Sequence, residues 1–124
     1  MRVLLVDDES ELVSTLAERL AIRGIQADWV TEAEDALRMA EANCYDVAVL
    51  DIRLPGMSGL DLQNIMKSKC PDLKFIFMTG HGSQGDFQAG TTEAGPDYYL
   101  VKPVSIEELM EKMNKLTSES GDPE

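Results

Sequence analysis

Val47-Ala48-Val49-Leu50-Asp51 is a short aliphatic run that ends on a carboxylate. An apolar, partly β-branched run of this length is typical of a strand buried on both faces, as in the interior of a parallel sheet. Pro55 and Gly56 follow closely, and they predict a break in regular structure over residues 52–57. Open α/β sheets bind ligands beyond the carboxyl ends of their strands, so this pattern indicates a functional position for Asp51. An aspartate there can also simply cap the next turn, so Asp51 alone decides nothing.

Strand-like and helix-like segments alternate along the whole chain. The predicted strands are 2–6, 26–30, 47–51, 75–78 and 98–101. The predicted helices are 10–23, 31–42, 58–69 and 105–116. Between them, residues 82–95 are rich in glycine and threonine, which predicts a short or mobile fourth helix. The alternation predicts an α/β domain with a parallel sheet and helices on both faces.

Three of the predicted helices begin with recognisable capping residues. Thr31 with Glu34, and Ser105 with Glu108, have the form of capping boxes. Ser58 is a favourable N-cap for the helix that follows the turn. These residues define where the predicted helices start.

Length and charge restrict the class of protein. The 124 residues suit one domain, predicted over 1–117, with the polar residues 118–124 as a disordered tail or the start of a linker. The net charge of −12 argues against binding to nucleic acid or to anionic membranes. No apolar run approaches the ~18 residues of a membrane span, and the first residues lack a secretory signal, so a cytoplasmic location is expected. His81 is the only histidine, which argues against zinc sites and histidine-assisted nucleophiles.

Polar residues collect at the carboxyl ends of the predicted strands. They are Asp7 and Asp8 after the first strand, Asp51 on the third, Thr79 on the fourth and Lys102 after the fifth. Two carboxylates ~4 Å apart repel by about 4 kcal/mol at an effective dielectric constant near 20, so a cation is expected between them. Few ligands, all of them oxygen, suit Mg²⁺ better than Ca²⁺. Asp7 and Asp8 could instead cap the first helix, but two adjacent acids exceed what a cap needs.

These residue types fit a phosphoryl transfer. Asp51 can act as a nucleophile towards phosphorus and form an aspartyl phosphate. Mg²⁺ and the ammonium of Lys102 would neutralise the transferring oxygens, and the Thr79 hydroxyl could donate a hydrogen bond to one of them.

Over residues 1 to about 116 the chain resembles the receiver domain of bacterial two-component response regulators. The resemblance rests on an ordered set of residues, each at its strand end: Asp7-Asp8, Asp51, Pro55-Gly56, Thr79 and Lys102-Pro103. It implies a flavodoxin-like, doubly wound sheet of five parallel strands in the order 2-1-3-4-5. It also implies a phosphorylation-activated signalling switch rather than an enzyme, with intrinsic self-phosphorylation and dephosphorylation chemistry.

The resemblance further implies a role for each site residue. Asp51 would be the phosphoacceptor, and Thr79 and Lys102 would hold the phosphoryl group. Asp8, Asp51 and the Arg53 carbonyl would ligate Mg²⁺ directly, with Asp7 acting through water. The remaining implied roles concern the switch and its surroundings: Thr79 and Tyr99 as switch residues, a cis bond at Pro103, and rate tuning by the side chains of Arg53 and His81.

The implied partners are a sensor histidine kinase, a second copy bound through the fourth helix, fifth strand and fifth helix, and a C-terminal output domain. The string Thr79-Gly80-His81-Gly82 resembles receivers of enhancer-dependent transcription activators. Residues 80–85 also fit G-x-G-x-x-G, but too little chain follows for a dinucleotide-binding unit.

Two alternative functions stay open. An aspartyl-nucleophile phosphatase also places aspartate at a strand end, but it requires a second aspartate where this chain has Arg53. A degenerate receiver would serve only as a docking module, which the filled signature positions argue against.

Overall fold

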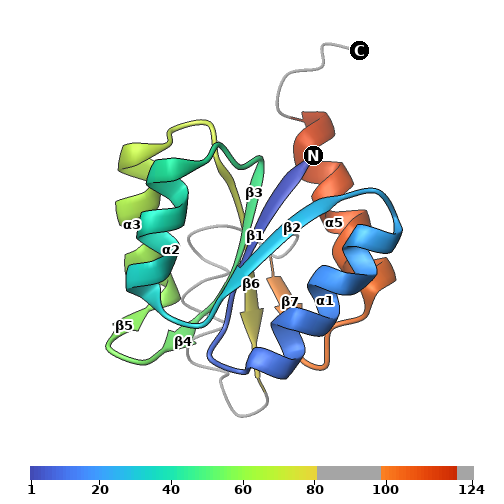
Figure 1. Cartoon of the computed structure of the whole chain (residues 1–124), viewed down its shortest axis with the longest axis horizontal. Helices are drawn as coiled ribbons and strands as arrows, with labels where there is room; N and C mark the ends of the chain where they lie inside the picture. Colours follow the sequence, from blue (N-terminus) through green and yellow to red (C-terminus); the bar gives the residue numbers. More distant parts are fainter. Residues whose placement is uncertain (81–98, 120–124) are drawn as a thin grey trace.

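The computed structural model describes residues 1–80 and 99–119. Strands and helices alternate as predicted along this part of the chain (Figure 1). The strands are β1 Arg2–Val6, β2 Gln26–Val30, β3 Val47–Asp51, β4 Arg53–Leu54, β5 Met57–Ser58, β6 Lys74–Thr79 and β7 Tyr99–Val101. The helices are α1 Ser10–Ile22, α2 Ala33–Ala42, α3 Gly59–Lys69 and α5 Ile106–Glu119.

Five strands form one sheet in the order β2-β1-β3-β6-β7, and every pairing in it is parallel. This order confirms the one implied by the resemblance, with β6 and β7 as the fourth and fifth strands. Since all strands run the same way, their carboxyl ends share one edge. Val6, Asp51, Thr79 and Val101, which end four of these strands, therefore lie at that edge.

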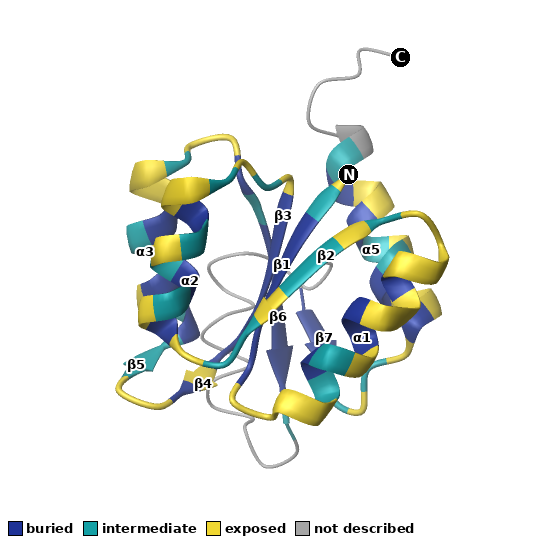
Figure 2. Ribbon diagram, in the orientation of Figure 1, coloured by how far each residue is buried: buried dark blue, intermediate teal, exposed yellow. Residues whose placement is uncertain are grey.

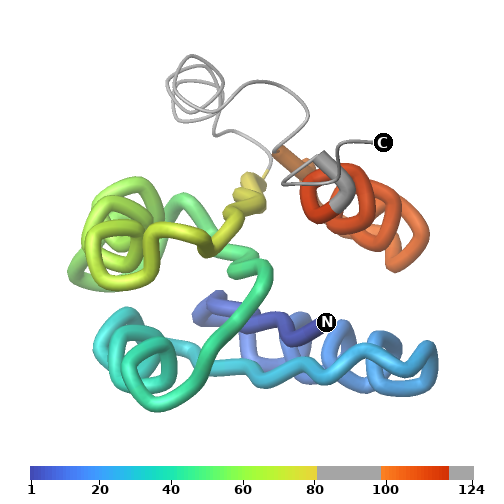
Figure 3. The backbone as a smooth tube through the Cα atoms, turned by 90° about the horizontal axis from the view of Figure 1, so that it is seen from above, coloured from blue at the N-terminus to red at the C-terminus, as the bar shows by residue number. Residues whose placement is uncertain are grey.

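Helices cover both faces of the sheet, with α1 and α5 on one face and α2 and α3 on the other (Figures 1 and 3). β3 shows why this requires an apolar run. Val47 and Val49 pack in the cluster beneath α1 and α5, whereas Ala48 and Leu50 pack in the cluster beneath α2 and α3. All five residues of β3 are buried (Figure 2). Successive side chains therefore pack into opposite halves of the core.

The turn after β3 is more regular than the sequence predicts. Residues 52–57 were expected to lack regular structure, but β4 and β5 pair as a small antiparallel hairpin. Pro55 and Gly56 form its turn, and Gly56 has φ of 80°, a value that favours glycine. The prediction was wrong because the proline and glycine reverse the chain tightly enough for two short flanks to pair.

The helix starts confirm two of the three capping predictions. The Ser58 hydroxyl accepts a hydrogen bond from the Asp61 N–H at 3.1 Å, and Ser105 accepts one from the Glu108 N–H at 3.1 Å. The box at Thr31 was wrong: α2 begins at Ala33, with Glu32 in the N-cap position and no side-chain capping bond.

Several predictions fall at the limits of the described residues. The predicted fourth helix and His81 lie within 81–98, outside those residues. Helix α5 extends to Glu119, so part of the predicted 118–124 tail is helical, and residues 120–124 lie outside the described range. Among the described helices, none has the length and apolar character to cross a membrane.

Candidate functional site

Three carboxylates meet at the carboxyl edge of the sheet. Asp7 and Asp8 follow β1, and Asp51 ends β3, the neighbouring strand. One oxygen from each of the three side chains lies within 4.8 Å of the others. Asp7 and Asp51 are buried, whereas Asp8 is exposed. The parallel pairing thus brings together the acids that the sequence predicted would meet.

The main chain around Asp51 fixes its side chain. The Arg53 N–H donates to Asp51 Oδ1 at 3.1 Å, and the Ile52 N–H donates to the Met78 carbonyl oxygen at 3.0 Å on β6. These bonds leave Asp51 Oδ2 facing the ammonium of Lys102, 3.2 Å away. The Arg53 side chain itself is exposed.

Asp7 is the most deeply buried of the three acids, with no exposed surface. Its Oδ1 accepts a hydrogen bond from the Glu9 N–H at 2.9 Å, and its Oδ2 lies 2.7 Å from Lys102 Nζ. Burial raises the pKa of Asp7 to about 6, although the bonds from Lys102 and the Glu9 main chain oppose the shift. A capping role does not explain these acids, because Glu9 occupies the N-cap position of α1 and no side chain caps that helix.

Lys102 reaches the site from the end of β7. Its N–H donates to the Thr79 carbonyl oxygen at 2.8 Å, which ties the segment to β6. The Lys102–Pro103 peptide bond is cis, as the resemblance implied. Burial lowers the pKa of Lys102, but the hydrogen bonds to Asp7 and Glu9 and the charge of Asp51 outweigh it and raise that pKa. The lysine is therefore held as an ammonium among carboxylates.

Glu9 belongs to this site and was missed by the sequence reasoning. Its Oε1 lies 2.9 Å from Lys102 Nζ. The signal available in the sequence was its place directly after Asp7-Asp8, as the third acid in a row at the end of the first predicted strand.

The two remaining predicted residues, Thr79 and Tyr99, lie beside the cluster on neighbouring strands. Thr79 ends β6, is buried, and is paired in register with Val101, the residue before Lys102. Its hydroxyl lies 3.5 Å from the Gly80 carbonyl oxygen. Tyr99 is buried and stacks on Phe77, with ring centroids 5.2 Å apart. Thr79 is thus at the edge that carries the acids, whereas Tyr99 lies in the core beneath it.

Sequence comparisons identify relatives over almost the whole chain. A family model for the response regulator receiver domain matches residues 3–114. The two-component response regulator PhoP of Pseudomonas aeruginosa is 39% identical over 121 residues, which cover 98% of this chain and 53% of PhoP. The transcriptional regulatory protein PrrA of Mycobacterium tuberculosis is 33% identical over 120 residues, 97% of this chain and 51% of PrrA. The chain therefore spans about half the length of these relatives.

Solved structures agree in fold. A response regulator receiver domain protein from Clostridium thermocellum is 30% identical with a TM-score of 0.82, and the match covers 92% of this chain and 91% of that one. The response regulator TrrA from Thermotoga maritima, solved in complex with Mg²⁺ and BeF, is 34% identical with a TM-score of 0.78, covering 93% and 97%. The comparisons do not support the enhancer-dependent subgroup suggested by residues 79–82. They do establish, together with the sheet order and the acidic edge, that this chain belongs to the receiver domain family of two-component response regulators.

Proposed function

We propose that this receiver is a phosphorylation-activated signalling switch in which Asp51 accepts a phosphoryl group from a sensor histidine kinase in a Mg²⁺-dependent reaction. The observation that carries the proposal is the position of Lys102 Nζ, 3.2 Å from Asp51 Oδ2 and 2.7 Å from Asp7 Oδ2. A buried carboxylate beside a fixed ammonium can receive an anionic group, because the cation balances the charge that arrives.

The acidic cluster fits a magnesium ion. Three carboxylate oxygens within 4.8 Å repel one another, and the exposure of Asp8 leaves room for the water ligands that Mg²⁺ retains. Asp8, Asp51 and the Arg53 carbonyl would ligate the ion directly, and Asp7 would act through water. When bound, the ion would neutralise negative charge on the oxygens of the transferring group.

The chain's own residues divide the transfer between them. An Asp51 carboxylate oxygen forms the new bond to phosphorus while the phosphorus–nitrogen bond of the donor phosphohistidine breaks and the imidazole leaves. Lys102 stabilises one phosphoryl oxygen, and the Thr79 hydroxyl donates to another. Thr79 ends β6, the strand next to β3, so its hydroxyl belongs to the same edge of the sheet as Asp51.

The conformational change caused by phosphorylation would be transmitted along β7. Tyr99 is the first residue of this three-residue strand and Lys102 directly follows it, so a shift of Lys102 at one end can be coupled to Tyr99 in the core. The output surface would comprise β7, α5 and the fourth helix that the sequence predicts, and it is also where a second copy would bind. Because the relatives are about twice as long, a C-terminal output domain that follows the receiver is part of the proposal.

The two alternative functions receive less support. The position where an aspartyl-nucleophile phosphatase needs its second aspartate holds Arg53, whose side chain is exposed, and the relatives are response regulators. A docking module without phosphorylation would not require an ammonium held by three carboxylates, here those of Asp7, Glu9 and Asp51 around Lys102.

The test is intact-mass analysis after incubation with acetyl phosphate and MgCl2. The wild type should gain the mass of one phosphoryl group, and Asp51→Asn should gain none. Asp61→Asn is the matched control, because Asp61 is exposed on the first turn of α3 away from the cluster. Absence of a mass gain in the wild type would favour the docking module, and rapid turnover of a phosphomonoester would favour the phosphatase.

A further inference from the structure

Lys102 is shared between buried carboxylates and one exposed carboxylate. Its Nζ lies 2.7 Å from Asp7 Oδ2, 3.2 Å from Asp51 Oδ2 and 2.9 Å from Glu9 Oε1. The Asp7 side chain is fully buried and that of Asp51 is 8% exposed, whereas that of Glu9 is 62% exposed. The ammonium is therefore drawn inward by two fixed partners and outward by Glu9.

The three partners differ in how easily they can release the lysine. Asp7 and Asp51 are each held by a main-chain N–H, from Glu9 and Arg53 respectively. Releasing either would leave a buried charge without its cation, which is costly. The Glu9 carboxylate can instead turn into water, where it is solvated.

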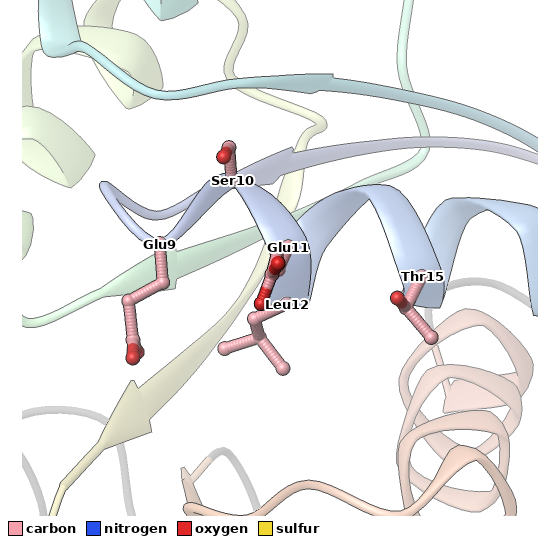
Figure 4. Close-up of a pocket in the computed structure, with 5 residues that line it drawn as sticks. All are labelled: Glu9, Ser10, Glu11, Leu12 and Thr15. Carbon is pink, nitrogen blue, oxygen red and sulfur yellow. The ribbon is translucent and has the colours of Figure 1, made fainter.

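The space next to Glu9 permits this movement. Glu9, Ser10, Glu11, Leu12 and Thr15 line an open groove of about 610 Å³ at the start of α1. Figure 4 shows the side chains of Glu9, Glu11, Leu12 and Thr15 on the same side of the helix, while Ser10 points the opposite way. Glu9 therefore has a solvent-filled position available beside the one in which it binds Lys102.

We propose that Glu9 is a positioning residue that competes with the phosphoryl group for Lys102 and so weakens the hold of the site on that group. The proposal rests on the function proposed above. A phosphoryl group on Asp51 adds negative charge beyond Oδ2, and the ammonium must turn towards it. Of the three carboxylates around Lys102, Glu9 is the one that can give way, and its pull on the lysine must then be overcome.

The expected size of the effect on binding follows from the solvent exposure of the Glu9–Lys102 ion pair. An exposed ion pair changes an equilibrium constant by a factor of about two to five. Removing the charge of Glu9 should therefore tighten binding of a phosphoryl analogue by about that factor.

The experiment is isothermal titration calorimetry of the full chain with beryllofluoride in saturating MgCl2. It compares the Kd of the wild type with those of Glu9→Gln and Glu11→Gln. Glu9→Gln should lower the Kd about two- to fivefold. Glu11→Gln removes the same charge from the same groove, and no ion pair joins Glu11 to Lys102 in the described part of the chain, so its Kd should stay near the wild-type value. Melting midpoints of both variants should stay near that of the wild type, which separates competition for Lys102 from a structural role.

Two results would overturn the proposal: equal tightening by both substitutions, which indicates general charge repulsion, or unchanged or weaker binding by Glu9→Gln. A wild-type chain that neither binds beryllofluoride nor gains mass with acetyl phosphate would instead reject the proposed function itself.

Discussion

Gly59, the first residue of α3, lies directly against the main chain of Asp51. A Cβ built on Gly59 would overlap the Asp51 carbonyl oxygen and lie only 3.0 Å from the carbonyl carbon. The Gly59 N–H also donates to the Ile52 carbonyl oxygen at 2.6 Å. A side chain at position 59 must therefore push α3 away from the strand end that carries the proposed phosphoacceptor.

Gly59→Ala should lower the free energy of unfolding by about 1–3 kcal/mol, the usual cost of overpacking a buried contact. It should also slow phosphorylation by acetyl phosphate, because Asp51 and the neighbouring hairpin would shift. Urea denaturation and intact-mass time courses measure the two effects. Gly80→Ala is the control, since a Cβ there meets no atom within 4 Å among residues 1–80 and 99–119. If both variants lost the same stability and the same phosphorylation rate, the contact between position 59 and the Asp51 main chain would not be the cause.

Asp7→Asn should stabilise the metal-free protein, and the gain should depend on pH. Burial raises the pKa of Asp7 from its ordinary 3.8 to about 6, so the native state holds this proton more tightly than the unfolded chain does. Ionising Asp7 therefore costs stability as the pH rises from about 4 through about 6. The expected gain is on the order of 3 kcal/mol above about pH 7 and close to zero below about pH 4.

Thermal melts in EDTA across this pH range test the prediction. The difference between Asp7→Asn and wild type isolates this one group from the other carboxylates. A difference that grows as the pH falls would contradict the assigned direction of the shift.

Magnesium should raise the melting midpoint of the wild type. An ion that binds only the native cluster stabilises it by RT ln(1 + [Mg²⁺]/Kd), about 2.7 kcal/mol at roughly 100 times the Kd. Asp8→Asn should abolish most of this response with little effect on the fold, because Asp8 is exposed. Asp61→Asn should respond like the wild type, and KCl at matched ionic strength should not reproduce the effect. If MgCl2 left the melting midpoint of the wild type unchanged, the proposed magnesium site would be rejected.

The parts of this molecule that could be predicted from sequence are those in which one strong pattern governs the outcome. The apolar run at Val47–Leu50 requires two covered faces, so it identifies an inner parallel strand. Parallel pairing then puts Asp7, Asp51 and Lys102 at one edge of the sheet, and the strand order implied by the family resemblance brings them close together. The Ser58 cap was predictable for a similar reason, since a serine shortly after the Pro55-Gly56 turn is a favourable N-cap for the helix that follows.

The parts that could not be predicted depend on distant segments. The Thr31 box failed because the exit from β2 is fixed by the sheet: the Asp7 N–H donates to the Val30 carbonyl oxygen at 3.3 Å. The role of Glu9 was hidden because its partner, Lys102, lies 93 residues further along the chain. No local pattern indicates which of several glutamates will reach a given lysine.

A polar cluster remote from the carboxyl edge likewise depends on residues that are far apart in the sequence. Tyr45, just before β3, donates from its hydroxyl to Asp28 Oδ2 on β2 at 2.6 Å. The Arg2 guanidinium lies over the Tyr45 ring, 5.2 Å from its centroid, and 3.8 Å from Asp28 Oδ2. Burial, followed by the hydrogen bond to Asp28, raises the pKa of Tyr45. These contacts fasten the loop before β3 to the edge strand β2.

Tyr45→Phe should lower the free energy of unfolding by about 1–2 kcal/mol, because it removes a hydrogen bond to a charged acceptor but keeps the ring beneath Arg2. Urea denaturation measures the loss, and adding Asp28→Asn to Tyr45→Phe should cost less than the two single losses together. Phosphorylation by acetyl phosphate should proceed as in the wild type, since Tyr45 precedes β3 and Asp51 ends it. Additive losses would show that the Tyr45 hydroxyl and Asp28 do not stabilise the fold as a pair. A large change in phosphorylation would show that the two ends of β3 are coupled, contrary to this expectation.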